Sequence, residues 1–205
     1  MQSDTKYLHA FALIPSVTGK TLRALAAYFP SFEEAWRADE GILRNAGLDE
    51  KTITAVSWKR PSLDPDREME TLIRKNIWLI READSGYPPL LAQIPNPPFV
   101  LYGAGRFSTH ESQLSFGVVG TRKPTSYGIQ ATELITETLA RAGACVISGL
   151  ALGIDAIAHR TAVETGGATI AILGSGIDDE SIYPQSNRGL ARRITESGGM
   201  IISEY

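Results

Sequence analysis

The C-terminal part of this chain repeats one pattern: a short apolar run, then a glycine-rich turn, then an amphipathic helical segment. The turns lie at Gly120, Gly149 and Gly174. Apolar runs that do not alternate with polar residues indicate strands buried on both faces of a sheet. Strands that alternate with helices are typical of an α/β domain with a parallel, doubly wound sheet. The pattern therefore predicts such a domain over residues 77–205.

Hydrophobic periodicity gives the positions of the expected elements. The apolar runs predict strands at 77–80, 99–102, 116–119, 144–147, 169–173 and 200–203. Amphipathic spacing predicts the later helices at 126–142, 154–165 and 187–197.

The N-terminal part has a different pattern, with short helical segments separated by turn residues. Residues 1–62 are expected to form a small all-α domain of the SAM-like or helix-hairpin-helix-like kind. Residues 14–21 resemble the hairpin of such DNA-binding modules, and residues 46–48 resemble a second copy. The sequence leaves open whether this domain contacts DNA or is only structural. Residues 63–76 are expected to form a linker and a charged helix.

Charge and composition limit how the chain can meet nucleic acid. The formal net charge is −3, and residues 106–205 hold eight Lys and Arg against ten Asp and Glu. Bulk attraction to a phosphate backbone is therefore disfavoured, and any contact must be focal. No apolar run is long enough for a membrane span, and the N-terminus lacks a secretory signal pattern. The single cysteine, Cys145, is interpreted as a small buried hydrophobic residue. Together these features predict a cytoplasmic protein.

The candidate site follows from the predicted sheet. The carboxyl ends of parallel strands meet at one edge, so the three turns would converge and offer backbone amides to an anion. Arg122 and Lys123 add positive charge there, and Tyr183 either stacks on a base or covers the sheet edge. The predicted nucleic-acid-binding residues are Gly120, Thr121, Arg122, Lys123, Ser148, Gly149, Gly174, Ser175, Gly176, Tyr183 and Asn187.

No cofactor, metal ion or catalytic residue is expected. The dinucleotide fingerprint fails after Gly174 because its last glycine position is Asp179. The P-loop-like end at Gly19 also fails, because the glycine required five residues earlier is Ile14. Three histidines and one cysteine form no obvious metal cage, and no Ser-His-Asp or paired-Glu arrangement stands out.

Asp155 and His159 lie four residues apart on a predicted helix and would share one face. Two interpretations remain open from the sequence. The residues form either a polar pair that faces the cleft or a hydrogen bond that stabilises the helix.

Several linked motifs resemble the DNA-processing protein A family, also called DprA or Smf. They are residues 119–125 with Tyr127-Gly128, residues 148–155 with Ala158-His159, residues 173–178 with Tyr183-Pro184 and Asn187, and residues 202–205. Upstream, Tyr87-Pro88 with Leu90 and residues 97–102 match as well. The resemblance covers the chain from about residue 76 and implies a Rossmann-like domain.

The resemblance also implies a function. Members of this family bind and protect single-stranded DNA and help to load the RecA recombinase during natural transformation, and they are not known as enzymes. The chain is therefore expected to be a single-stranded DNA-binding recombination mediator, with single-stranded DNA and RecA as partners. By resemblance, the strand is held around Arg122, Lys123 and the turns at Ser148-Gly149 and at residues 174–176.

The family pattern continues beyond Tyr205 with a Pro-Gly-rich stretch and a basic segment, so the chain looks truncated before the end of the Rossmann-like domain. We expect this chain to fold, to be mainly a monomer rather than a homodimer, and to bind DNA with reduced affinity.

An alternative from another class is a Rossmann-like nucleotide-binding enzyme, such as a nucleotide phosphoribohydrolase. Those enzymes carry a Gly-Gly-Gly turn and a Pro-Gly-Gly-x-Gly-Thr turn, and neither occurs in this sequence.

Overall fold

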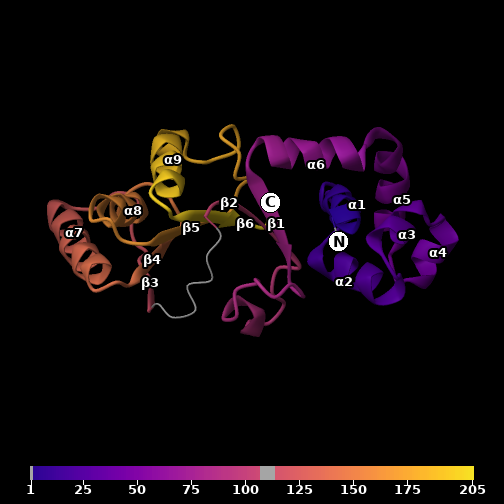
Figure 1. The fold of residues 1–205 in the computed structure, drawn as a ribbon, viewed down its shortest axis with the longest axis horizontal. Helices are drawn as coiled ribbons and strands as arrows, with labels where there is room; N and C mark the ends of the chain where they lie inside the picture. The colour runs from indigo at the N-terminus through magenta and orange to yellow at the C-terminus, as the bar shows by residue number, and fades with distance from the viewer. Residues whose placement is uncertain (1, 107–113) are drawn as a thin grey trace. The chain divides into compact units, whose positions relative to one another are not determined.

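The computed structural model describes residues 2–106 and 114–205, and the chain divides into two compact units, Met1–Lys75 and Asn76–Tyr205 (Figure 1). The first unit is all-α. Its helices are α1 (Gln2–Ala12), α2 (Gly19–Tyr28), α3 (Phe32–Arg37), α4 (Glu40–Asn45), α5 (Glu50–Lys59) and α6 (Pro65–Arg74), with a 3-10 turn at Arg60–Ser62.

Aromatic packing forms the centre of the first unit. The centroid of the Phe11 ring lies 4.9 Å from that of the Trp36 ring and 6.4 Å from that of the Phe32 ring, and both pairs have edge-to-face geometry. Leu8 and Leu25 are fully buried in the same unit. Burying such side chains is the main source of stability for a domain this small.

Helices α2 and α5 begin in the same way. The Thr18 hydroxyl accepts from the amide of Thr21, and the Asp49 carboxylate accepts from the amide of Thr52. Residues 17–25 and 48–56 align without a gap and share Lys, Thr and Ala at matching positions. The similarity between the two segments therefore extends beyond residues 46–48, and their assignment as paired hairpins stays a prediction.

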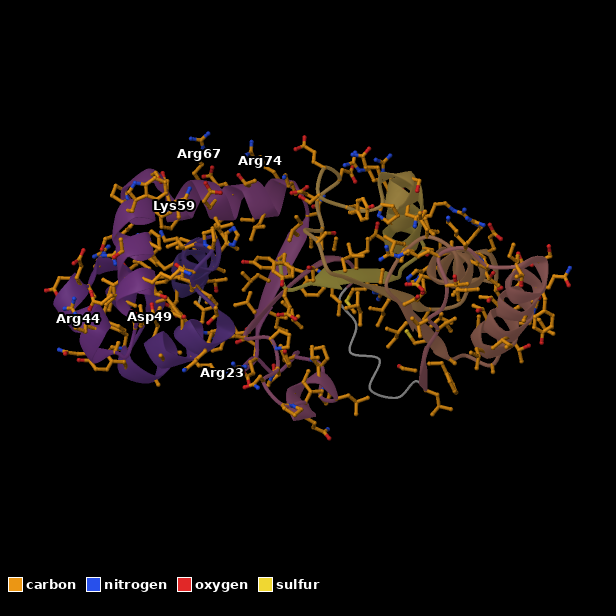
Figure 2. The ribbon with its side chains drawn as sticks, turned by 180° about the vertical axis from the view of Figure 1, so that it is seen from behind. Arg23, Arg44, Asp49, Lys59, Arg67 and Arg74 are labelled. Atoms are coloured by element: carbon orange, nitrogen blue, oxygen red, sulfur yellow. The ribbon has the colours of Figure 1, made fainter. Side chains whose placement is uncertain are left out.

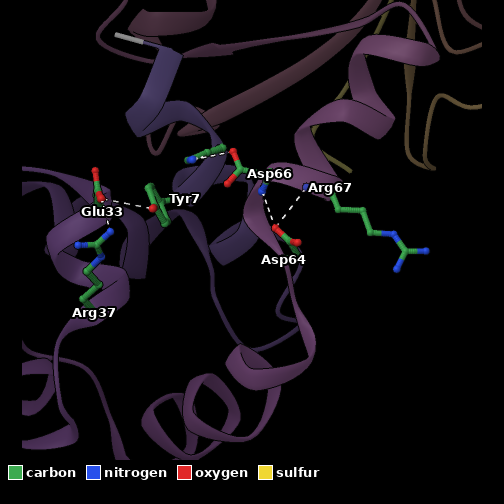
Figure 3. Close-up of polar contacts among 7 residues, drawn as sticks. Tyr7, Glu33, Arg37, Asp64, Asp66 and Arg67 are labelled. Carbon is green, nitrogen blue, oxygen red and sulfur yellow. Dashed lines mark hydrogen bonds and ion pairs between the residues drawn. The ribbon is translucent and has the colours of Figure 1, made fainter.

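An ion pair joins α6 to α1 within the first unit (Figure 3). The ammonium of Lys6 lies 2.6 Å from the Asp66 carboxylate, and α6 packs along α1. Asp64 caps α6 by accepting from the amides of Asp66 and Arg67. The predicted charged helix within residues 63–76 therefore lies inside the first unit. Arg67 and Arg74 project outward from it (Figure 2).

The second unit contains one six-stranded sheet. Its strands are β1 (Ile77–Arg81), β2 (Val100–Gly105), β3 (Ser115–Gly117), β4 (Cys145–Ser148), β5 (Thr169–Leu173) and β6 (Met200–Ser203), in the order β1-β2-β6-β5-β4-β3. Strands β3 to β6 are parallel, whereas β2 is antiparallel to both of its neighbours. This arrangement confirms the predicted fold class: a Rossmann-like, mostly parallel sheet preceded by an all-α part.

Three helices connect the parallel strands: α7 (Ser126–Arg141), α8 (Ile154–Glu164) and α9 (Arg188–Glu196). Helix α8 packs against both α7 and α9, so the three lie side by side along the sheet (Figure 1). Val146, Ala158 and Ala162 form a buried cluster between β4 and α8. The small side chains on α8 allow the helix to approach the strand closely.

Cys145 is fully buried at the start of β4, and burial raises the pKa of its thiol to about 11. A thiol with such a pKa is unreactive near neutral pH. The interpretation of Cys145 as a small buried hydrophobe is confirmed. Among the described residues, no helix has both the length and the apolar character needed to cross a bilayer.

Candidate nucleic-acid interface

A cavity of about 230 Å³ lies where the turns after β3, β4 and β5 meet. Five of the predicted site residues line it: Arg122, Gly149, Gly174, Ser175 and Tyr183. The apolar part of its wall comes from four residues that are not among the predicted site residues: Ala151, Leu152, Leu173 and Pro184. The cavity therefore combines a cation, glycine-rich backbone and apolar side chains, which is the usual composition of a ligand site.

Arg122 supplies the positive charge of the cavity. Arg122 and Lys123 are both exposed, and neither forms an ion pair with any residue in the described part of the chain. By contrast, Arg141 is paired with Glu137, and Arg192 with Asp179. An unpaired guanidinium can bind a phosphate without first giving up another partner.

The turn after β3 is called the first turn, and the turns after β4 and β5 are called the second and the third. The other predicted residues of the first turn determine its backbone conformation. A Cβ atom on Gly120 would lie 2.7 Å from a side-chain carbon of Ile154, so only glycine allows this turn to pack on α8. The hydroxyl of Thr121 accepts from the amide of Lys123 at 3.1 Å, and the carbonyl of Thr121 accepts from the amide of Ile154. These contacts fix the turn that carries Arg122.

The second turn is held by buried polar groups. The Ser148 hydroxyl donates to the carbonyl of Val118 at 2.6 Å and so links the end of β4 to the end of β3. The amide of Gly149 donates to the Asp155 carboxylate at 3.2 Å. The hydroxyl of Ser148 and the amide of Gly149 are therefore both engaged within the protein.

The third turn is more open. A Cβ atom on Gly174 would meet no atom within 4 Å, whereas one on Gly176 would lie 2.7 Å from the Cβ of Ser181. The Ser203 hydroxyl, at the end of β6, donates to the carbonyl of Ser175 at 2.7 Å and orients the turn. Within residues 2–106 and 114–205, the amides of residues 174–176 have no acceptor in the protein.

Asn187 does not line the cavity but bonds to the backbone of the second turn, which does. Its side-chain amide donates to the carbonyls of Leu150 at 2.8 Å and Ala151 at 3.2 Å, and only 7% of the residue is exposed. Leu150 has a φ of 55°, a left-handed conformation that is unfavourable for a residue other than glycine. Asn187 thus links the segment after β5 to the second turn and holds Leu150 in this conformation.

We therefore expect Asn187→Ala to lower the free energy of unfolding by about 2 kcal/mol, because the buried carbonyl of Leu150 and the part-buried carbonyl of Ala151 lose their donor. Urea unfolding of the purified chain measures this change. The exposed neighbour Gln185 provides the control, and Gln185→Ala should change stability by less than about 0.5 kcal/mol. Equal stability of the two variants would contradict the positioning role of Asn187.

Tyr183 lies at the rim of the cavity with 73% of its surface exposed, and a cis peptide bond joins it to Pro184. An exposed ring beside an apolar wall is available for stacking on a base. Both interpretations from the sequence, stacking on a base and covering the sheet edge, stay predictions.

Asp155 and His159 do not bond to each other. His159 is fully buried and its Nδ1 lies 2.8 Å from the Thr169 hydroxyl, which donates to the carbonyl of Val146. Burial lowers the pKa of His159 to about 4, against opposing effects of the Ser148 backbone and the Asp155 charge. His159 is therefore a neutral core residue, and Asp155 faces the second turn instead.

Comparisons with known proteins agree with this architecture. Residues 78–205 match the family described as DNA recombination-mediator protein A. The chain is 39% identical to the Smf protein of Synechocystis over 99% of its own length, and 33% identical to the Smf protein of Escherichia coli over 83%. It covers 51% and 46% of these two proteins, so it spans about half the length of its curated relatives.

Two solved structures share the fold. The structure of DprA from Streptococcus pneumoniae matches with a TM-score of 0.73 and 24% identity, over 98% of this chain and 67% of that one. DprA from Helicobacter pylori, a structure described for its single-stranded DNA binding mode, matches with a TM-score of 0.54 and 31% identity over 63% of this chain and 55% of that one. The matched sequence and the shared fold together establish that this chain belongs to the DNA recombination-mediator protein A family, whose members are also called DprA and Smf.

Proposed function

We propose that this chain binds single-stranded DNA at the cavity between the three turns and acts as a recombination mediator in DNA uptake. The observation that carries this proposal is the Arg122 guanidinium, which has no ion-pair partner among the described residues and lies at a cavity with apolar walls and open backbone amides. The single-stranded DNA binding described for the Helicobacter pylori relative supports it. Transfer of the strand to RecA is a further part of the proposal and rests on the family resemblance, and a cytoplasmic location is proposed from the composition.

The geometry suggests how one nucleotide is held. A phosphate lies between Arg122 and the open amides of the third turn, because both favour an anion. The attached base packs on Leu152 and the exposed ring of Tyr183, since stacking and apolar contact are the common means of holding single strands. These contacts do not read base edges, so binding shows little sequence preference.

The proposed role is binding without turnover. The buried, neutral His159 is not positioned to act as a general base in the cavity, and its hydrogen bond is made with Thr169. We therefore propose that the chain holds DNA and does not cleave it or hydrolyse nucleotides.

Replacing Arg122 with Ala should weaken binding of a single-stranded oligonucleotide roughly tenfold at low salt, because a charge-assisted contact is lost. The slope of log K against log salt should fall by about 0.7, the value for one lost phosphate contact on a single strand. Fluorescence anisotropy at several salt concentrations measures both quantities. Duplex DNA of the same length should bind more weakly than the single strand.

Arg67→Ala provides the matched control, because Arg67 is also an exposed arginine and projects from α6 in the first unit (Figure 2). This variant should bind as the unaltered chain does. Equal loss of affinity in both variants would show that binding depends on overall charge and would contradict a site at the cavity. Equal affinity for duplex and single strand would contradict it as well.

A further inference from the structure

A carboxylate lies directly behind the second turn of the cavity. Asp155 occupies the first turn of α8, only 5% of it is exposed, and its Oδ2 accepts from the amide of Gly149 at 3.2 Å. A Cβ atom on Gly149 would lie 2.9 Å from the same oxygen, so the carboxylate is in close contact with the turn. Gly149 itself lines the cavity.

Asp155 changes what the second turn can bind. The beginning of a helix favours an anion, but here the side chain of Asp155 already supplies the negative charge. The amide that would hold a phosphate oxygen is engaged, and a phosphate placed there would lie close to a buried carboxylate. The negative charges of the phosphate and of the Asp155 carboxylate would repel each other strongly there, because solvent is partly excluded.

The third turn has the opposite character. The amides of residues 174–176 have no protein acceptor within the described residues, and Gly174 opens onto free space. Arg122 lines the same cavity. The two turns thus differ in their amides and in the nearby charge. An amide of the second turn is bonded to a carboxylate, whereas the amides of the third turn have no acceptor among the described residues and Arg122 lines the same cavity.

We propose that Asp155 is a specificity-determining residue, which keeps phosphate away from the second turn and so directs it to the third turn and Arg122. The second turn, with Ala151 and Leu152, then faces the uncharged base. Asp155 thereby fixes which way a nucleotide lies in the cavity. This inference rests on the proposed function for its biological meaning, but the placement of the anion can be tested without DNA.

The first test titrates the unaltered chain with inorganic phosphate and follows backbone amides by NMR. We expect the signals of Gly174 and Ser175 to shift, while that of Gly149 stays in place. In Asp155→Asn the amide oxygen can still accept from Gly149 but the charge is gone, so the Gly149 signal should now shift too. Binding of a single-stranded oligonucleotide to this variant should tighten roughly threefold to tenfold at low salt.

The control is Asp39→Asn, which makes the same change at a helix start in the first unit, where Asp39 accepts from the amide of Ile42. It should leave both readouts unchanged. Phosphate shifts at Gly149 in the unaltered chain, or no response at the third turn, would overturn the inference. Unchanged or weaker oligonucleotide binding by a folded Asp155→Asn variant would also overturn it, because that result is expected if Asp155 has only a structural role.

The two proposals fail separately. If the unaltered chain binds no oligonucleotide but phosphate shifts Gly174 and spares Gly149, the proposed function is wrong and the anion placement stands. If Asp155→Asn fails to fold, the phosphate titration of the unaltered chain still decides the placement.

Discussion

Gly153→Ala is expected to destabilise the second unit by about 3 to 5 kcal/mol, the range of severe single substitutions. Gly153 has a φ of 80°, and a Cβ atom there would lie 2.2 Å from the carbonyl oxygen of Thr121 and 2.8 Å from the Cα of Arg122. Both atoms belong to the backbone, so no side-chain rotation relieves the clash. Moving that backbone would also break the bond from the amide of Ile154 to the carbonyl of Thr121.

Gly166→Ala is the matched control, because Gly166 has a similar φ of 74° but no atom lies within 4 Å of its added Cβ. Its cost should be limited to the backbone conformation, about 1 kcal/mol. Urea unfolding compares the two variants. A difference of less than about 1 kcal/mol between them would show that the close approach of Gly153 to the first turn is not a source of stability.

Acidification is expected to produce the second large effect. Burial lowers the pKa of both His9 and His159 to about 4, against an ordinary value of 6.5. Between these values the unfolded chain binds a proton that the folded chain does not. The stability is therefore intact above about pH 6.5 and falls as the pH decreases towards 4, by about 3 kcal/mol for each histidine.

The two histidines lie in different units, so each unit should lose stability in this range. Urea unfolding at pH 7 and at pH 4.5 measures the loss. His159→Gln, which can still donate to the Thr169 hydroxyl, should reduce the pH dependence of the second unit, and His9→Gln that of the first. A His159→Gln variant with the full pH dependence would show that this histidine does not titrate with folding.

The sequence determined the elements of the second unit well, because its strands are short apolar runs bounded by turn residues. The strands expected at 169–173 and 200–203 have those limits in the structure. The strand expected at 116–119 is instead Ser115–Gly117. Val119 is 84% exposed, because the chain leaves the sheet to reach the turn that packs on α8. An apolar residue alone does not reveal where pairing stops.

The sequence also indicated where a ligand site should lie, since the carboxyl ends of parallel strands must share one edge. It could not decide the sheet order, in which β2 enters beside β6 and runs antiparallel to it. Strand neighbours depend on packing between residues that are far apart in the chain, and periodicity carries no information about that.

Only the tertiary structure decided which polar groups of the site are available to a ligand. Ser148 is engaged by Val118, thirty residues away, and Asn187 by Leu150, thirty-seven residues away. Asp155 bonds to Gly149 rather than to His159, which pairs with Thr169. Turn chemistry and charge are local properties that a sequence displays directly, whereas the partner of a buried polar group is chosen by the strands and helices that the fold brings together, because each buried group must find a hydrogen bond wherever the packing offers one.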